Sequence, residues 1–443
     1  MAILRSAELA VLVGVQLPGE SSQEHAATLE ELEALLDTAG GAPVAVVSQR
    51  RAAPDPATYI GKGKLEEIKE IIAATGADAV VFNEDLSPAQ QRNLEERLNV
   101  KILDRTIIIL DIFAQHATSR EGKAQVEVAQ LTYMLPRLRG WGDALSRQAG
   151  GRAAGGAGMG GRGPGETQLE VDRRKIDRRM TKLRRDLKGY ERIRRTKSSQ
   201  REDSRVPTIA VVGYTNAGKS SLLNRLTKSD VLVEDRLFAT LDPTARQMEL
   251  PDGRTVVMTD TVGFIRKLPT GLIQSFLSTL EESARADMLL HVVDASHPEA
   301  EAHIVAVQEV LEEIGADTLP FILALNKSDN VDRTTLEALA RRVKVELDTE
   351  PILVSAHSGE GCDELVTTLG LRMPSNRIPI TATVPFSEHA LVALAHEHGE
   401  VESEEHGEHG TTLVAAVDVA VARRMRRYLE VDPFPDETEE WER

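Results

Sequence analysis

Gly213-Tyr-Thr-Asn-Ala-Gly218-Lys219-Ser220 is a complete G-x-x-x-x-G-K-S sequence, the pattern of a phosphate-binding loop. The segment before it, TIAVV, is a β-branched apolar run that favours a buried strand, and SLLNRLTK after it favours a helix. In such a setting the glycines let backbone N–H groups turn inward around phosphate oxygens. Lys219 then reaches the β- and γ-phosphates, and the Ser220 hydroxyl ligates Mg²⁺. The sequence therefore predicts a nucleoside triphosphate site.

A later apolar segment, PFILAL, indicates which base is bound, because it leads into Asn326-Lys-Ser-Asp329. A carboxylate at Asp329 can accept hydrogen bonds from N1–H and N2–H of guanine, whereas adenine presents no matching pair of donors. A site built for one base rejects the other by roughly 10⁴ or more. The predicted base is guanine.

Neighbouring residues complete the predicted base site. Asn326 either bonds the N7 edge of guanine or ties neighbouring loops together, and the Lys327 stem covers the base plane. A second strand-like run, PILVS, leads into Ser355-Ala356. We expect the Ala356 N–H to donate to guanine O6.

The segment VVMTD lies between these motifs and ends at Asp260, and Thr261-Val262-Gly263 follows it. We expect Asp260 in the second shell of Mg²⁺ and the Gly263 N–H beside the γ-phosphate. Each motif follows a predicted strand, and ligands in open α/β sheets collect along the carboxyl edge. In this order of motifs the chain resembles the translation-factor-related GTPases. The resemblance implies that Thr240 closes on Mg²⁺ when the γ-phosphate is present, with Thr244 as the alternative.

These motifs define the predicted site. Catalytic roles fall to Lys219, Thr240 and Gly263, and metal binding falls to Ser220, Thr240 and Asp260. Nucleotide contacts are predicted for Gly213, Tyr214, Thr215, Asn216, Ala217, Gly218, Lys219, Ser220, Ser221, Asp260, Thr261, Val262, Gly263, Asn326, Lys327, Ser328, Asp329, Ser355 and Ala356.

Phe264 occupies the position after Gly263, where a Ras-like enzyme keeps the glutamine that orients the attacking water. A phenyl ring cannot orient water, so a partner completes the site or another group supplies the missing charge stabilisation. Asn216 resembles the asparagine of GTPases that hold K⁺ beside the phosphates, where a cation replaces an arginine finger. The alternative is that Asn216 only stabilises the loop.

Composition sets the frame around this site. The chain has 443 residues, 41% of them hydrophobic, and a single cysteine, Cys362, which excludes an internal disulfide. LAVLVGVQL near the start is too short to span a bilayer and predicts a first strand. We expect a soluble, cytoplasmic monomer with no membrane insertion.

Four domains are predicted: an α/β domain at 1–115, a basic helical hairpin at 116–205, the GTPase domain at 206–373, and a small α+β domain at 374–443. The GTPase domain is predicted to have a mostly parallel, doubly wound sheet.

The predicted hairpin is basic although the chain as a whole carries a net charge of −17. Residues 137–205 contain 20 Lys and Arg against 9 Asp and Glu. Apolar residues recur at helical spacing on both arms of the hairpin, from Ala124 to Leu138 and from Ile176 to Tyr190. A basic element on an acidic body is the pattern of a protein that presents one element to a polyanion.

The predicted tip of the hairpin, 150–165, has nine glycines in sixteen residues. Composition alone favours a flexible linker. Its position between two basic helices favours instead a narrow element that enters a crevice lined with phosphates, and structured RNA is such a surface.

Specific strings then identify a family. Gly161-Arg-Gly-Pro-Gly-Glu-Thr-Gln-Leu-Glu170, Thr58-Tyr-Ile-Gly-Lys-Gly-Lys64 and Phe238-Ala-Thr-Leu-Asp-Pro-Thr244 resemble the HflX family over nearly the whole chain. The resemblance implies a GTPase that binds the large ribosomal subunit and its rRNA, places the hairpin tip near the peptidyl-transferase centre and splits stalled or idle ribosomes. The loop before Gly161 is longer and richer in glycine and alanine than is typical of the family. Implied ribosome contacts are Arg152, Gly160, Gly161, Arg162, Gly163, Arg173 and Arg174.

Two other functions stay open: a GTPase of ribosomal subunit assembly or rRNA maturation, and a signalling switch with a protein or membrane partner. Gly61-Lys-Gly-Lys64 lacks the spacing and the serine of a phosphate loop and predicts a surface turn. The histidines at 389, 396, 398, 406 and 409 lie among glutamates, which favours a solvent-exposed hairpin over a metal site.

Overall fold

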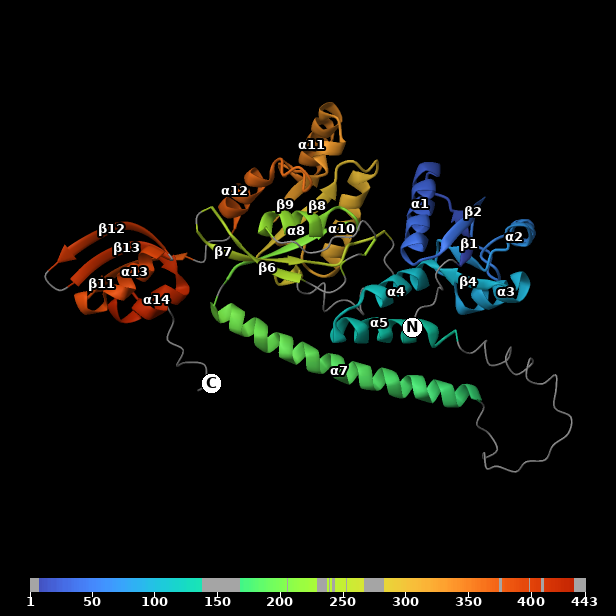
Figure 1. Ribbon diagram of the computed structural model, residues 1–443, viewed down its shortest axis with the longest axis horizontal. Coiled ribbons are helices and arrows are strands. Elements are labelled where there is room, and N and C mark those ends of the chain that lie inside the picture. The colour runs from blue at the N-terminus through green and yellow to red at the C-terminus, as the bar shows by residue number, and fades with distance from the viewer. Residues whose placement is uncertain are drawn as a thin grey trace, which may run out of the picture.

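The computed structural model describes residues 8–137, 168–204, 206–228, 237–238, 240, 244–251, 253–266, 283–373, 377–397, 399–407 and 410–433. The predicted tip at 150–165 lies outside these residues, and so do its predicted ribosome contacts Arg152, Gly160, Gly161, Arg162 and Gly163. The described chain is built on three separate sheets, and a long helix runs beneath two of them (Figure 1).

The first sheet is parallel, in the order β2-β1-β3-β4. The run predicted as a first strand forms its central strand, β1, and both of its faces are covered by apolar clusters. Helix α1 begins with a capping box in which Ser21 and Glu24 satisfy each other's backbone N–H groups. The elements of this first sheet and the helices around it are β1 (Leu9–Gln16), α1 (Ser22–Thr38), β2 (Ala42–Arg50), α2 (Lys62–Thr75), β3 (Ala79–Phe82), α3 (Pro88–Leu98), β4 (Lys101–Asp104) and α4 (Arg105–His116).

Gly61-Lys-Gly-Lys64 is the start of helix α2 and not only a surface turn. Gly61 is the N-cap residue, and Lys62 and Lys64 lie in the first helical turn. The loop before it is held by helix α3, where Gln90 Nε2 donates to the Asp55 carbonyl at 2.9 Å.

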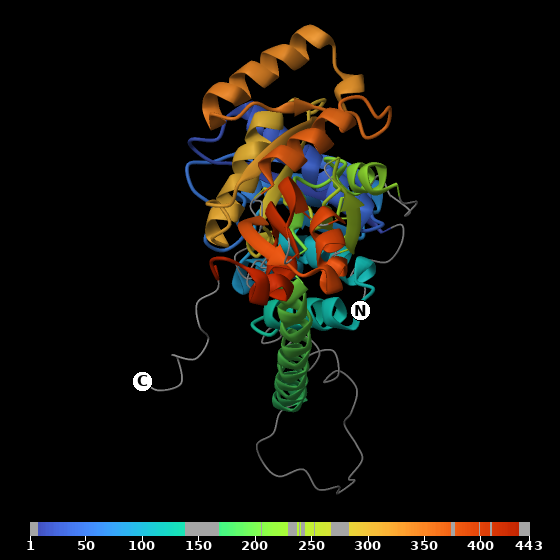
Figure 2. The same ribbon diagram turned by 90° about the vertical axis from the view of Figure 1, so that its left-hand side faces the viewer.

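Two helices form the basic hairpin: α5 (Arg120–Met134) and α7 (Gln168–Ser204). The seam predicted on α7 packs against α5, with Met180 and Leu183 buried. Arg179 on α7 donates two hydrogen bonds of 2.6 Å to the carboxylate of Glu127 on α5. Helix α7 is 37 residues long and projects along the lower side of the molecule (Figures 1 and 2).

The second sheet has the order β10-β9-β8-β5-β7-β6 and is parallel except for β6, which runs antiparallel to β7. Helices α8 and α12 cover one face and α10 and α11 the other. The elements are β5 (Thr208–Gly213), α8 (Lys219–Thr227), β6 (Thr244–Glu249), β7 (Thr255–Asp260), β8 (Met288–Asp294), α10 (Ala300–Glu313), β9 (Phe321–Asn326), α11 (Arg333–Leu347), β10 (Ile352–Leu353) and α12 (Cys362–Arg372). The strand order reverses beside β5, and ligands of such sheets bind at the carboxyl ends of the strands there.

The third sheet is antiparallel in the order β11-β13-β12, with α13 and α14 packed on one face. Its elements are β11 (Arg377–Val384), α13 (His389–Glu397), β12 (Gly399–Gly407), β13 (Gly410–Asp418) and α14 (Val419–Met425). His396 pairs with Glu404 at 2.8 Å. Among the described residues no group of His, Cys, Asp or Glu side chains is arranged to hold a metal ion, and His398 and His409 lie outside them.

None of the helices in the described part of the chain combines the length and the apolar character needed to cross a membrane.

Candidate functional site

The predicted phosphate loop lies at the carboxyl end of β5 and ends in the first turn of helix α8. Two of its glycines are required by geometry. Gly213 has φ +151°, and a Cβ there would lie 2.1 Å from the Val292 carbonyl oxygen. Gly218 has φ +88°, and a Cβ there would lie 2.3 Å from Asn326 Nδ2. A side chain at Gly213 would collide with the backbone of β8, whereas one at Gly218 would strain the left-handed backbone and displace the Asn326 amide.

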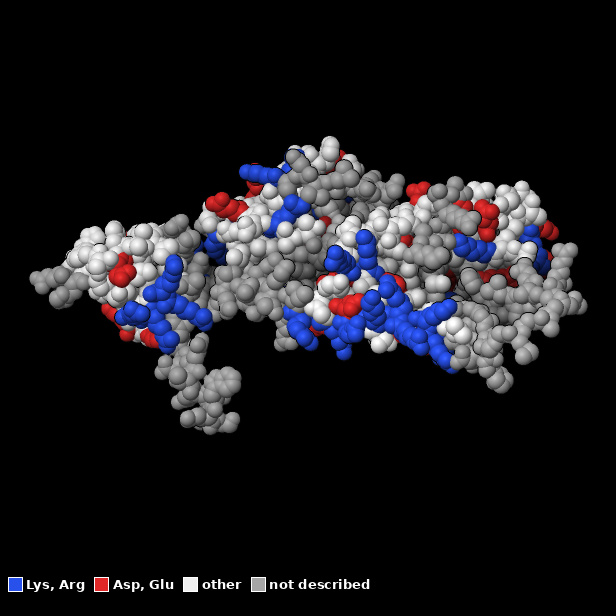
Figure 3. All heavy atoms as spheres, turned by 60° about the horizontal axis from the view of Figure 1, so that its bottom comes forward, with Lys and Arg blue, Asp and Glu red and all other residues white. Residues whose placement is uncertain are grey.

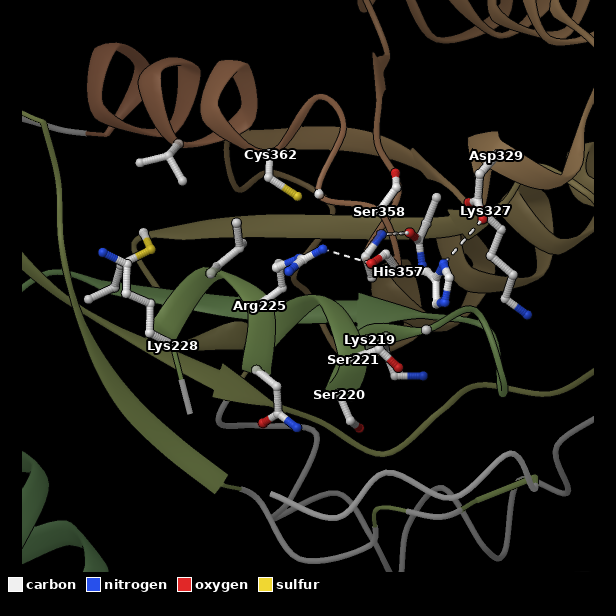
Figure 4. A pocket seen from close by; sticks show the side chains of 18 of the residues that line it. Lys219, Ser220, Ser221, Arg225, Lys228, Lys327, Asp329, His357, Ser358 and Cys362 are labelled. Carbon is white, nitrogen blue, oxygen red and sulfur yellow. Dashed lines mark hydrogen bonds and ion pairs between the residues drawn. The ribbon is translucent and has the colours of Figure 1, made fainter. Parts of the chain in front are cut away.

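A cavity of about 1690 Å³ opens beside this loop (Figure 4). It lies between the first turn of α8 and the loops that follow β9 and β10. The predicted residues that line it are Thr215, Asn216, Gly218, Lys219, Ser220, Ser221, Thr240, Thr261, Gly263, Asn326, Lys327, Asp329 and Ala356. Gly213, Tyr214, Ala217, Asp260, Val262, Ser328 and Ser355 lie next to these residues in the same strands and loops.

Lys219 is buried at the base of the cavity, and its Nζ donates to the carbonyls of Gly213 at 3.1 Å and Tyr214 at 2.8 Å. Burial lowers the pKa of Lys219 to about 8, while the negative charge of Asp260 acts in the opposite direction. The two hydrogen bonds that the described residues give this buried ammonium go to neutral carbonyls, so phosphate oxygens nearby would favour its charge.

Three oxygen-bearing side chains meet at one side of the loop. Ser220 Oγ donates to Asp260 Oδ2 at 2.5 Å, and Thr240 Oγ1 lies 2.9 Å from Ser220 Oγ and 3.1 Å from Asp260 Oδ2. The other carboxylate oxygen, Asp260 Oδ1, is buried and bonds to none of the described residues. Hard oxygen donors with one unsatisfied carboxylate oxygen fit Mg²⁺.

The structure favours Thr240 over Thr244 as the metal-side threonine. Thr244 is the first residue of β6 and is paired with Asp260 in the antiparallel ladder. Thr240 precedes that strand and places its hydroxyl beside Ser220.

Asn326 ties two loops together, which is one of its two predicted roles. Its Nδ2 donates to the Ala217 carbonyl at 2.8 Å, and its Oδ1 accepts the Ala356 N–H at 3.0 Å. The Ala356 N–H, which is expected to donate to guanine O6, thus bonds to Asn326 in this arrangement, and its contact with the base stays a prediction.

Asp329 lies in a short 3₁₀ turn (Ser328–Asn330) at the far side of the cavity, with 28% of its side chain exposed. A hydrogen bond from the Ser355 side chain, with a smaller contribution from the charge of His357, lowers the pKa of Asp329. Lys327 adopts φ +59° and its Nζ pairs with Asp294 at 2.7 Å. The Asp329 carboxylate is thus ionised and available to accept two hydrogen bonds at the mouth of the cavity.

Arg225 is a supporting residue that the sequence did not reveal. From helix α8 its Nη2 donates to the His357 carbonyl at 2.7 Å, which fixes the loop that carries Ala356 (Figure 4). No local pattern marks it, because its partner is 132 residues away.

Phe264 does not face the cavity. It is 2% exposed and lies in an apolar cluster with Tyr214 and Phe238, where the second sheet meets helix α4 of the first. Its backbone N–H donates to the Gly213 carbonyl at 3.1 Å, and its carbonyl accepts the Thr215 N–H at 2.8 Å. The ring therefore serves packing, and no glutamine-like group stands after Gly263.

Three family models match the chain. They are described as GTP-binding GTPase N-terminal over residues 26–114, GTP-binding GTPase Middle Region over 116–201, and 50S ribosome-binding GTPase over 208–327. The matched regions agree with a GTPase fold built on a mostly parallel sheet and preceded by further domains, as predicted.

Relatives named GTPase HflX match most of the chain. The protein of Alkalihalophilus pseudofirmus is 44% identical over 404 residues, 91% of this chain and 92% of that one. The protein of Escherichia coli is 41% identical over 400 residues, 90% of each chain. A solved GTP-binding protein from Sulfolobus solfataricus, in complex with GDP, is 26% identical with a TM-score of 0.43, over 82% of this chain and 98% of that one. The chain carries a GTPase domain and belongs to the HflX family of GTPases.

Proposed function

We propose that this GTPase acts on the large ribosomal subunit, inserts the hairpin tip (150–165) near the peptidyl-transferase centre and splits stalled or idle ribosomes in the cytoplasm. The observation that carries the proposal is the pairing of a GTP site with a long basic helix on one face of the molecule. The match to a 50S ribosome-binding GTPase model supports the same partner.

The proposed GTP site uses the residues predicted from the motifs. Lys219 and the phosphate-loop N–H groups hold the phosphates, Gly263 contacts the γ-phosphate, and Asp329 reads guanine. Ser220, Thr240 and Asp260 would hold Mg²⁺, which would supply positive charge to neutralise the phosphates.

The basic face of α7 is the proposed surface for rRNA. Its exposed Lys and Arg residues lie at 173–175, 178–179, 182, 184–185, 188 and 192. Figure 3 shows these cations gathered in a band along α7. Arg173 and Arg174, predicted as ribosome contacts, lie within it. Phosphate contacts of this kind supply affinity without sequence selectivity and weaken with salt.

A second group of arginines lies on the same face, over the C-terminal domain (Figure 3). Four of the six basic residues between 374 and 443 are Arg423, Arg424, Arg426 and Arg427, in a segment otherwise rich in acidic residues. All four are exposed. Arg426 pairs with Asp432 at 2.6 Å, and the four guanidinium groups still form a local concentration of positive charge. We propose that this end of the domain also meets phosphate groups.

Sedimentation with purified large subunits in a non-hydrolysable GTP analogue tests the proposal. Arg178→Glu with Arg185→Glu should abolish co-sedimentation. A matched exchange on α11, Arg333→Glu with Arg341→Glu, should leave it unchanged, because those exposed arginines lie on another element. Equal binding by both double variants would contradict the proposal.

Splitting is tested separately by light scattering of intact ribosomes. Replacing 150–161 with a short turn should stop splitting and leave unstimulated GTP hydrolysis unchanged. If the native chain binds large subunits yet never separates intact ribosomes, the outcome would favour a role in subunit assembly.

A further inference from the structure

Tyr214, the second residue of the phosphate loop, points away from the cavity and into the contact between the first two sheets. Its hydroxyl donates to the carboxylate of Glu31 on α1 and accepts the backbone N–H of Arg266 at 2.8 Å. Its ring stacks on His303 of α10, with centroids 3.7 Å apart and planes 4° from parallel. One side chain thus joins the phosphate loop, the first domain and the segment that follows Gly263.

Arg105 makes a second connection between the same parts. Its Nη2 pairs with Glu31 Oε2 at 2.5 Å and donates to the Arg266 carbonyl at 3.1 Å. The backbone of Arg266 is therefore held at both its N–H and its carbonyl by groups that converge on Glu31. Only 13% of the Glu31 side chain and 4% of the Arg105 side chain are exposed, so these charges depend on each other.

In the same structure that contains the Glu31 contacts, Thr240 lies beside the predicted Mg²⁺ ligands Ser220 and Asp260. Phe113 of α4 packs edge-on against Phe238, with centroids 4.7 Å apart. Two residues later, Thr240 lies against Ser220 and Asp260. A contact from the first domain therefore lies two residues from Thr240, whose hydroxyl meets Ser220 and Asp260.

We propose that Glu31, Tyr214 and Arg266 form a junction through which the N-terminal domain favours GTP over GDP at the phosphate loop. Glu31 is a positioning residue, because it acts through Tyr214 and Arg266 and does not line the cavity. GDP has no γ-phosphate to engage Gly263 and Thr240, so its binding gains less from a closed junction. A broken junction therefore weakens GTP binding more than GDP binding.

The test uses the full chain without ribosomes, so its outcome is independent of the proposed ribosomal role. Fluorescent GDP and a fluorescent non-hydrolysable GTP analogue are titrated into Glu31→Gln, Tyr214→Phe and the double variant. The ratio of GTP-analogue to GDP affinity should fall about five- to twentyfold in each single variant. The fall in the double variant should be smaller than the product of the two single effects, because both changes act on the shared Tyr214–Glu31 contact.

Glu33→Gln is the matched control, since Glu33 is an exposed glutamate two residues along the same helix. It should leave the ratio unchanged. The junction is refuted if Glu31→Gln behaves like Glu33→Gln, if GDP and GTP-analogue affinities fall in equal proportion, or if the two single effects add. If the Tyr214→Phe variant does not fold, the comparison of Glu31→Gln with Glu33→Gln is sufficient to test the junction.

Discussion

Phe113 and Phe238 meet edge to face, with ring centroids 4.7 Å apart and planes at 77°, where the N-terminal domain contacts the segment leading to Thr240. Both rings are almost fully buried, at 1% and 2% exposure. Aromatic pairs in this geometry contribute about 0.5–1.5 kcal/mol beyond the area they bury. The segment before Thr240 is therefore anchored by a side chain from another domain.

Phe113→Leu should loosen this anchor while keeping an apolar core. We expect GTP-analogue affinity to fall several-fold and GDP affinity to stay near that of the native chain. Phe82→Leu is the control, because Phe82 is also buried in the first domain but packs on Tyr59, away from the contact. Chemical unfolding should show a similar loss for both variants, about 1–2 kcal/mol. An equal loss of GTP-analogue binding in both would contradict the anchor.

Nucleotide affinity should depend on pH through Lys219. Burial lowers its pKa to about 8, whereas an unfolded lysine titrates near 10.5. Between these values the unfolded chain binds the extra proton, so the nucleotide-free protein gains stability from this group as pH rises. GTP and GDP need the protonated ammonium, so their affinity should fall above about pH 8. Isothermal titration from pH 7 to 9.5 measures this, and Lys219→Met should bind weakly with a flattened profile. If the affinity of Lys219→Met falls with pH as steeply as that of the native chain, a group other than Lys219 causes the pH dependence.

Asp329→Asn should change which base is bound. In the proposed site the carboxylate would accept two hydrogen bonds from guanine, whereas an amide in its place offers one donor and one acceptor. GDP affinity should fall at least a hundredfold, and XDP should bind better than GDP, because xanthine carries an oxygen where guanine carries an amino group. Competition with both nucleotides measures the exchange. Asp332→Asn serves as the control, since Asp332 caps helix α11 through the Thr335 N–H and does not line the cavity.

Asn216 gives a test for K⁺. It lines the cavity in a left-handed conformation with φ +59° and is exposed. If it holds K⁺ beside the phosphates, GTP turnover should be several-fold faster in K⁺ than in Na⁺ at equal ionic strength, and Asn216→Ala should abolish the difference. Equal rates in the two salts for the native chain would show that Asn216 only shapes the loop.

The arginine cluster of the C-terminal domain should contribute to binding of large subunits. Arg423→Glu with Arg424→Glu and Arg427→Glu should lower affinity at least tenfold and reduce the slope of log affinity against log salt by about three. Arg333→Glu with Arg341→Glu and Arg342→Glu reverses three exposed arginines on α11 and should alter neither quantity. If affinity falls with the slope intact, the cluster contacts protein and not phosphate.

The sequence determined the chemistry of the GTP site because the motifs that make it are local. One motif is a glycine-bounded loop between a strand and a helix, and the others are short strings at the ends of later strands. Each can be recognised from a few consecutive residues. A short continuous apolar run likewise predicted β1, and apolar residues at helical spacing predicted the seam on α7. Thr240 followed from a family string of seven residues.

Only the tertiary structure decided how those pieces are connected. Glu31 and Tyr214 are 183 residues apart, and nothing near either one indicates the other. The role of Asn326 was open in the sequence because one amide can bond a base or a loop, and only the folded arrangement of β9 and β10 places it between Ala217 and Ala356. Local patterns record what each segment can do alone, whereas partners across domains are chosen by packing, which brings distant residues together.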